Sequence, residues 1–256
     1  MLRPRIIPCL LVQNKGLVKT VKFKDAKYVG DPLNAVKIFN EKEVDELMVI
    51  DIDATVQKRE PDFEMIKNLA VECRMPFCYG GGVTTAEQAR KIIGLGAEKV
   101  AISAAAIENP KLVSDISKAV GAQSVVVVLD VKKKIFGGYE VMTHNGKKSS
   151  GKSPVELAKQ FESLGAGEIV INSIDNDGEM KGYDMTIADK IREAVNIPLT
   201  IIGGAGSADD LARLIQRFGI IGAAAGSLFV FKGVYKAVLI NYPKAEEKAR
   251  LLKGIF

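Results

Sequence analysis

An internal repeat constrains the fold of this chain more than any other feature of its sequence. Residues 46–53, ELMVIDID, match residues 168–175, EIVINSID, at an offset of 122 positions (168 − 46 = 122). The pair Gly81-Gly82 matches Gly203-Gly204 at the same offset. Self-similarity at a fixed offset indicates one structural unit used twice. We therefore expect two halves related by a pseudo-twofold axis, with equivalent binding sites in each.

Short apolar runs, most of them rich in Val and Ile, alternate with helical patterns, and this alternation recurs eight times. The predicted strands are Ile6–Leu11, Glu46–Ile50, Phe77–Tyr79, Lys99–Ser103, Ser124–Leu129, Glu168–Asn172, Leu199–Ile202 and Gly222–Ala225. The predicted helices are Asp31–Glu43, Asp62–Cys73, Thr85–Leu95, Pro110–Val120, Pro154–Leu164, Met185–Ala194, Ala208–Phe218 and a last one after Phe231. Such alternation favours a parallel sheet.

The length of the chain decides between an open and a closed sheet. Eight strand-helix units in 256 residues match one (β/α)₈ barrel, which typically has ~250 residues. We therefore expect an α/β fold, a single TIM-barrel domain over residues 1–256. Its half-barrels are expected at about 1–122 and 123–256.

Capping residues precede several of the predicted helices. Thr84 with Glu87, and Ser207 with Asp210, have the spacing of reciprocal caps at a helix start. Asp31 precedes a proline at the first helical position, which is a common helix start. These signals support the predicted helix boundaries.

Composition excludes several classes of protein. Hydrophobic residues make up 47% of the chain and charged residues 26%, which is typical of a globular domain. No apolar run reaches the ~18 residues that a membrane span needs, and Met1–Arg5 lacks the apolar core of a signal peptide. The net charge of +5 is spread along the chain, which does not indicate nucleic-acid binding. We expect a cytoplasmic protein that binds neither nucleic acid nor membrane.

Cysteine and histidine usage narrows the chemistry further. Cys9, Cys73 and Cys78 form no Cys-x-x-Cys pair and are expected as free thiols of a reducing compartment. The single histidine, His144, falls in a polar loop. One histidine cannot supply a His-based metal site, and its setting does not favour a Ser-His-Asp triad. We expect no metal and no cofactor.

Two glycine-rich turns each follow a predicted strand and precede a predicted helix. They are residues 80–84, GGGVT, and 203–207, GGAGS. Backbone N–H groups in such turns bind anions, and equivalent turns in a repeat predict two phosphate sites. Tight-turn geometry alone is the alternative interpretation. The residues expected to bind phosphate, on these turns and after the fourth and eighth strands, are Gly81, Gly82, Ser103, Gly204, Gly206, Gly226 and Ser227.

Carboxylates cluster at the ends of predicted strands. They are Asp51, Asp53, Asp130, Asp175 and Asp177. In a barrel of parallel strands these ends meet at the mouth, where carboxylates are candidates for general acid-base work. A helix cap or a solvated loop is the alternative for each of them. The first strand supplies Leu11 where the repeat partner of Asp130 is expected.

Four charged residues stand at the opposite ends of the strands. Arg5, Glu46, Lys99 and Glu168 begin the first, second, fourth and sixth predicted strands. Two positive and two negative side chains there can form a closed ring on the barrel floor. Simple exposure to solvent is the alternative. A buried ring adds little stability, which favours a role such as a gate.

Eight short segments, spread over essentially the whole chain, are similar to one known family. They are Arg5–Leu10, Gly30–Pro32, Gly80–Gly82, Ala105–Pro110, Val125–Asp130, Gly165–Glu168, Ser173–Gly178 and Gly203–Gly206. They resemble the cyclase subunit of imidazole glycerol phosphate synthase. The resemblance implies a duplicated TIM barrel with a HisH-like glutaminase subunit on its floor. It also implies that ammonia crosses the floor and the barrel to a doubly phosphorylated ribosyl-carboxamide at the mouth.

The resemblance assigns roles to particular residues of this chain. Arg5, Glu46, Lys99 and Glu168 correspond to the ammonia gate. The catalytic residues implied are Asp130, Asp177 and Lys19, the last in the flexible loop after the first strand, and Gly178 joins the phosphate site. Leu11 stands where the family has a catalytic aspartate, and Ser103-Ala104 stands where it has Asn-Thr.

These departures resemble a subgroup of the family, the WbuZ-type paralogues associated with glycosyl amidation. The segments that resemble this subgroup are Val18–Lys24, Lys27–Pro32, Phe39–Glu46, Thr143–Gly146 and Ala237–Pro243. The subgroup implies ammonia delivery to a sugar amidotransferase in surface-polysaccharide biosynthesis. Two alternatives stay open: an authentic cyclase of histidine biosynthesis, which is a lyase, and a non-catalytic scaffold for the glutaminase.

Overall fold

The structure is a computed structural model that describes residues 3–233 and 235–251. Both limits of the expected domain, residues 1 and 256, therefore lie outside the described residues. Met1 and Leu2, on which the expectation of no signal peptide partly rests, also lie outside the described residues.

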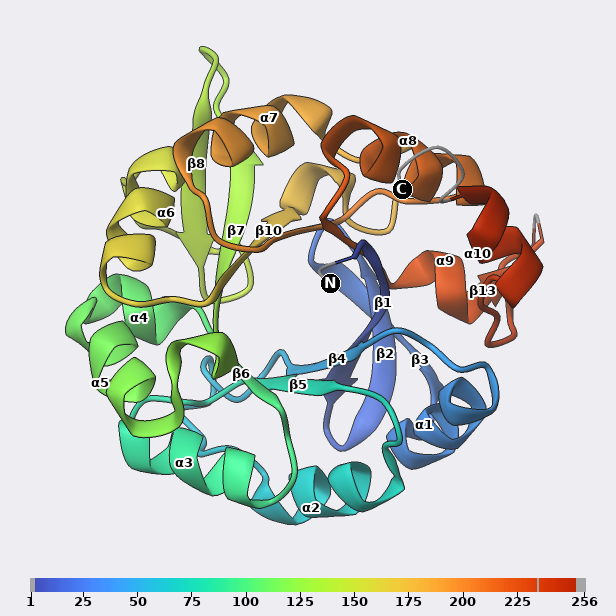
Figure 1. Ribbon diagram of the computed structural model, residues 1–256, viewed down its shortest axis with the longest axis horizontal. Coiled ribbons are helices and arrows are strands. Elements are labelled where there is room, and N and C mark those ends of the chain that lie inside the picture. Colours follow the sequence, from blue (N-terminus) through green and yellow to red (C-terminus); the bar gives the residue numbers. More distant parts are fainter. Residues whose placement is uncertain (1–2, 234, 252–256) are drawn as a thin grey trace.

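Eight parallel strands of the described residues close into a barrel, which confirms the expected TIM-barrel fold (Figure 1). They are β1 (Arg5–Gln13), β4 (Leu47–Asp51), β5 (Phe77–Gly80), β6 (Lys99–Ile102), β7 (Val125–Lys133), β10 (Glu168–Ser173), β11 (Leu199–Ile202) and β12 (Gly222–Ala225). Each pairs with the next in this order, and β12 pairs with β1 from Arg5↔Gly222 to Pro8↔Ala225. The amino ends of the eight strands therefore meet at one end of the barrel, and their carboxyl ends meet at the other.

Helices surround the strands, as Figure 1 shows in a view along the barrel. They are α1 (Pro32–Glu41), α2 (Phe63–Glu72), α3 (Ala86–Gly94), α4 (Ala104–Glu108), α5 (Lys111–Val120), α6 (Pro154–Ser163), α7 (Met185–Ala194), α8 (Ala208–Phe218), α9 (Ser227–Val230) and α10 (Ala245–Leu251), with 3₁₀ turns at Ala122–Ser124 and Ile174–Asn176. Ser207 and Asp210 cap α8 reciprocally, as expected. The cap of α3 is displaced by one residue, because Thr85 and Gln88 form the reciprocal pair instead of Thr84 and Glu87.

Additional short strands supplement the eight strands of the barrel. They are β2 (Gly16–Val21) and β3 (Lys24–Gly30) after β1, β8 (Tyr139–Thr143) and β9 (Lys148–Ser149) after β7, and β13 (Phe231–Lys232) and β14 (Ala237–Val238) near the C-terminal end. The segment after the first strand is therefore an antiparallel extension of β1 and not the loop that the sequence suggested. Antiparallel pairing supplies partners for its backbone N–H and C=O groups.

The core has two layers. Apolar side chains such as Phe39, Phe77 and Phe161 fill the space between strands and helices. A smaller cluster, which includes Ile7, Met48 and Val170, fills the inside of the barrel. Within residues 3–233 and 235–251, no helix has both the length and the apolar character that a membrane crossing requires.

Candidate functional site

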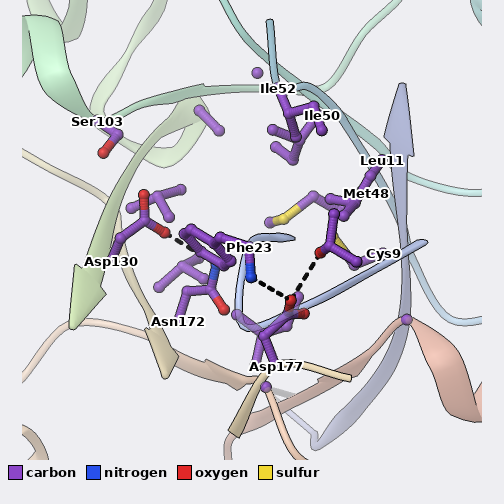
Figure 2. A pocket seen from close by; sticks show the side chains of 18 of the residues that line it. Cys9, Leu11, Phe23, Met48, Ile50, Ile52, Ser103, Asp130, Asn172 and Asp177 are labelled. Carbon is purple, nitrogen blue, oxygen red and sulfur yellow. Dashed lines mark hydrogen bonds between the residues drawn. The ribbon is translucent and has the colours of Figure 1, made fainter. Parts of the chain in front are cut away.

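A cavity opens at the carboxyl ends of the barrel strands. Its two sides differ in chemistry, and Figure 2 shows the difference. Leu11, Ile50 and Ile52 make one side apolar, whereas Asp130 and Asp177 stand on the other. A ligand held here would meet hydrocarbon on one flank and carboxylates on the other. Charge introduced on the apolar flank would be poorly stabilised.

Asp130 is the central carboxylate of the polar side. Strand β7 carries it, and its register partner on β10 is Asn172. The Asn172 amide donates a hydrogen bond of 2.9 Å to an Asp130 oxygen. Burial raises the pKa of Asp130 to about 7, and the nearby Asp177 carboxylate acts in the same direction. Asp130 can therefore exchange a proton near neutral pH.

Asp177 anchors the extension of β1 over the mouth. Its carboxylate accepts hydrogen bonds from the Thr20 hydroxyl at 2.7 Å and the Phe23 N–H at 3.1 Å. Its backbone carbonyl accepts one from the Lys22 N–H at 3.0 Å. These bonds hold the Phe23 ring in the middle of the cavity, between Asp130 and Asp177 (Figure 2). Burial raises the pKa of the Asp177 carboxyl.

Lys19 lies on β2, and the expectation that it sits in a flexible loop is wrong. Its side chain is buried, with the residue 5% exposed, and its ammonium donates a hydrogen bond of 2.7 Å to the Cys9 carbonyl. Burial lowers the pKa of Lys19. The pairing of β2 with both β1 and β3 directs this lysine into the cavity beside Gly226.

The two glycine turns face the cavity from opposite halves of the barrel. Gly82 has φ +73° and Gly204 has φ +113°, which L side chains rarely adopt. A Cβ atom on Gly204 would lie 2.1 Å from the Gly182 carbonyl oxygen, so close packing alone already requires glycine there. The predicted phosphate-binding residues that line the cavity are Gly81, Gly82, Ser103, Gly178, Gly204, Gly226 and Ser227.

The structure does not bring Gly206 to this cavity. Its N–H donates to the Asp210 carboxylate at 2.9 Å, within the cap of α8. An N–H that already has an acceptor has no hydrogen left for a phosphate oxygen. Gly206 is glycine for a packing reason, since a Cβ atom there would lie 2.3 Å from the Met180 carbonyl oxygen.

The other strand-end carboxylates have structural partners. Asp51 accepts from the backbone N–H groups of Asp53 and Ala54, both at 3.1 Å, and pairs with Arg59 at 3.2 Å. Asp53 accepts from the Gln13 amide at 3.2 Å, and Asp175 accepts from the Lys133 N–H at 2.8 Å. Their hydrogen-bonding capacity is used in shaping the loops. Among the described residues, no group of three metal-ligating side chains could hold a metal ion.

The four charged residues at the strand starts form a closed ring on the barrel floor. Lys99 lies 2.8 Å from Glu46 and 2.9 Å from Glu168, while Arg5 lies 2.8 Å from Glu168 and also pairs with Glu46. Each cation thus bridges both carboxylates. The Glu46 and Glu168 side chains are only 3% and 5% exposed. Two positive and two negative charges make the ring neutral.

Electrostatics inside the ring keep its carboxylates ionised. Burial alone would raise the pKa of Glu168, but Arg5 and Lys99 lower it to about 2. Thr200, on the neighbouring strand β11, donates a further hydrogen bond to Glu168. Thr200 could not be predicted as part of the ring, because a single threonine in an apolar strand looks like any other strand residue.

Between the ring and the mouth, the inside of the barrel is lined by uncharged side chains. These are Ile7, Cys9, Met48, Cys78, Ala101, Val126, Val170 and Ala224. Burial raises the pKa of the Cys9 thiol to about 11, so this thiol stays neutral at physiological pH. Along the barrel axis, a floor of charged side chains is therefore followed by an apolar interior and then by a mouth with one apolar and one carboxylate-bearing side.

Known proteins share this sequence over nearly its full length. The family described as histidine biosynthesis protein matches residues 5–236. A provisionally named imidazole glycerol phosphate synthase subunit of Vibrio vulnificus (strain YJ016) is 58% identical, over 99% of this chain and 98% of its own. A similarly named protein of Pseudomonas aeruginosa is 51% identical over 95% and 97% of the two chains.

A further relative carries the enzyme name without qualification. The imidazole glycerol phosphate synthase subunit HisF of Exiguobacterium sibiricum is 40% identical, over 90% of this chain and 91% of its own. The barrel, the mouth carboxylates and the floor ring stand within the matched residues. This chain therefore belongs to the family of HisF-like imidazole glycerol phosphate synthase subunits.

Proposed function

We propose that this protein is a cytoplasmic ammonia-conducting subunit, which receives ammonia from a HisH-like glutaminase at the barrel floor and releases it at the mouth. The observation that carries the proposal is the closed neutral ring of Arg5, Glu46, Lys99 and Glu168 beneath an apolar interior. An open floor would exchange its contents with solvent. A ring held by four ion pairs can close the floor and still open when one pair separates.

The interior suits ammonia in its neutral form. Side chains such as Ile7, Val126 and Val170 offer no group that would solvate an ammonium ion, and transfer of a charge into such surroundings is costly. Neutral NH₃ can cross, whereas NH₄⁺ is excluded by the same lining. Ammonia made at the floor would thus reach the mouth as a nucleophile.

The mouth supports delivery of ammonia better than the cyclase reaction. Leu11 faces the cavity opposite Asp130, and a leucine cannot exchange a proton (Figure 2). Loss of one essential acid-base group typically costs ~10²–10⁴ in rate. The authentic cyclase of histidine biosynthesis stays the second candidate, because Asp130 has a pKa of about 7 and Lys19 reaches the same cavity.

We further propose that the acceptor is a sugar amidated in surface-polysaccharide biosynthesis, through a sugar amidotransferase partner, as in the WbuZ-type paralogues. The relatives support a subgroup: four provisionally named ones are 51–58% identical to this chain, whereas four named HisF without qualification are 37–40% identical. The glycine turns with Gly82 and Gly204 would hold a phosphorylated small molecule at the mouth.

The first experiment separates the two candidates. The purified protein is mixed with ammonia and the doubly phosphorylated cyclase substrate, and consumption of the substrate is followed. We expect turnover at least 100-fold below that of a HisF enzyme assayed in parallel. Turnover comparable to that enzyme would refute the conduit as the main function.

A second experiment tests conduction and excludes a mere scaffold. Lys99→Met removes one ring cation and keeps a long side chain. In a complex reconstituted with the glutaminase and the amidotransferase, product formation is measured with glutamine and separately with ammonium chloride. We expect the glutamine-dependent rate to fall at least tenfold and the ammonium-dependent rate to stay unchanged. Equal rates with glutamine in wild type and variant would contradict the gate and leave the scaffold interpretation. Arg90→Met, on the exposed surface of α3, serves as the matched control.

A further inference from the structure

The only histidine of the chain, to which the sequence assigned no function, lies at the mouth of the barrel. His144 and Asn145 form the turn between β8 and β9, and both line the same cavity as Asp130. Their φ angles are +53° and +56°, a region that residues other than glycine seldom occupy. A half-buried imidazole is thus held over the cavity by an unusual backbone conformation.

Strand register explains how the turn reaches the cavity. Asp130 pairs with Asn172 on β10 and with Met142 on β8, so these two strands lie on opposite edges of β7. β6 pairs with β7 only as far as Val127 and then ends. Beyond Val127, β8 therefore pairs with the same edge of β7 that β6 occupies before it. Because β8 runs antiparallel to β7, its last residue lies close to the end of β6, where Ser103 stands.

Two contacts from the segment after the turn support this placement. The Lys148 ammonium lies 3.7 Å from the Glu108 carboxylate, and the Lys152 ammonium donates a hydrogen bond of 3.2 Å to the Ile107 carbonyl. Both partners belong to α4, which starts directly after Ser103. The turn thus reaches across the mouth, because the chain after it lies beside α4 whereas Gly146 faces Ile174 and Phe23.

The Thr143 hydroxyl contacts both the His144 ring and a backbone carbonyl. It lies 3.1 Å from Nδ1 of His144 and 3.3 Å from the Lys148 carbonyl oxygen. When the hydroxyl donates to that carbonyl, it can only accept from Nδ1, and the neutral ring takes the Nδ1–H form. Nε2 has no hydrogen-bond partner among the described residues, so in this form its lone pair is free to accept.

We infer that His144 contacts the phosphorylated ligand of the mouth, and that Nε2 accepts a hydrogen bond and a proton from it. Nε2 would add an acceptor to the two carboxylates of the mouth, of which Asp177 already accepts from Thr20 and Phe23 and Asp130 accepts from Asn172. When a reaction places positive charge on a ligand nitrogen or oxygen, its bond to hydrogen breaks and an Nε2–H bond forms. The resulting imidazolium returns the proton to water.

This inference rests on the proposed function, because it needs a ligand at the mouth. Ribose 5-phosphate is a suitable probe, since its phosphate matches the glycine turns and its hydroxyls can donate to Nε2. The single histidine gives one set of imidazole signals in ¹⁵N NMR spectra. At pH 8 we expect the pattern of the Nδ1–H form, and the Nε2–H pattern would overturn the inference.

Titration with ribose 5-phosphate then separates the two proposals. Amide signals of Gly82 and Gly204 report ligand binding, and the Nε2 signal of His144 reports contact with the ring. Changes in both support the inference. Changes in the amide signals alone would overturn it and leave the phosphate sites standing. No change in any signal would contradict the phosphate sites and the inference together.

A pair of variants adds an energetic test. His144→Asn keeps a residue that tolerates the left-handed conformation and removes the imidazole. Lys147→Ala alters an exposed side chain of the same turn and is the control. Loss of one hydrogen bond predicts a two- to tenfold weaker affinity for ribose 5-phosphate in His144→Asn. Equal affinity in both variants, with the same amide spectrum as wild type elsewhere, would overturn the inference.

Discussion

Glu168→Gln removes one negative charge from the floor ring and keeps the shape of the side chain. In the wild type, Glu168 balances Arg5 and Lys99 together with Glu46. The variant leaves two cations to share one carboxylate, so the ring carries an uncompensated positive charge in a buried position. Breaking a buried ion pair by removing one partner destabilises a fold strongly. We expect the variant barrel to unfold at a lower urea concentration.

The magnitude follows from the pKa of Glu168. Burial would raise this pKa, but Arg5 and Lys99 lower it to about 2, against 4.5 for an unperturbed glutamate. The difference is 2.5 (4.5 − 2 = 2.5) and is worth about 3 kcal/mol of stability at pH 7. Because the folded state has the lower pKa, the unfolded state binds the proton first as pH falls. The contribution is therefore nearly full above pH 4.5 and falls to about 1 kcal/mol at pH 3 and to well under 1 kcal/mol at pH 2.

The assay compares urea unfolding of the wild type and the variant at pH 7, 4.5, 3 and 2. Subtracting the two free energies removes the titration of the carboxylates that lie outside the ring. Glu87→Gln, an exposed residue of α3, is the control and should cost under about 0.5 kcal/mol at any pH. A difference between wild type and Glu168→Gln that stays constant from pH 7 to pH 2 would refute this account of the ring.

Three further predictions concern the mouth. Leu11→Asp supplies a carboxylate on the apolar side, and we expect cyclase turnover with ammonia and the doubly phosphorylated substrate to rise about 100-fold; unchanged turnover would favour the authentic cyclase. Gly204→Ala places a Cβ atom 2.1 Å from the Gly182 carbonyl oxygen at φ +113°, so urea unfolding should show a loss of more than about 2 kcal/mol. A loss below 0.5 kcal/mol would show that the turn relaxes freely. Asp177→Ala removes the acceptor of the Phe23 N–H, and hydrogen exchange of that amide should accelerate at least tenfold.

The repeat and the strand pattern predicted the barrel well, because most of the barrel strands are short apolar runs rich in Val, Ile or Ala. The extra strands escaped prediction for a physical reason. β3, Lys24–Gly30, is half-buried at most, and its charged residues show no apolar alternation. Its pairing with β2 is decided by the neighbouring strand and by the turn at Lys22 and Phe23. The loop position of Lys19 is what the family resemblance implies, and that resemblance carries no information on the pairing of β2.

Those parts of the candidate site could be predicted in which a residue type is rare at its position in the fold. Charges at the starts of buried strands, such as Glu46 and Glu168, indicated the ring. The sequence could not distinguish Asp130, whose carboxylate accepts one hydrogen bond from Asn172, from Asp51, which also borders the cavity but is engaged by Arg59 and local N–H groups. That distinction depends on where each loop turns. His144 was missed because register, and not composition, places it over the mouth.

The ring also has a consequence for the folding kinetics of the barrel. Its pairs join residues 41, 53, 69 and 163 positions apart, and the longest connects Arg5 with Glu168. Such distant residues meet only after much of the chain has been ordered, so these contacts form late. Interactions absent from the transition state slow unfolding and leave the folding rate nearly unchanged. The ring therefore lengthens the lifetime of the closed barrel without hastening its formation.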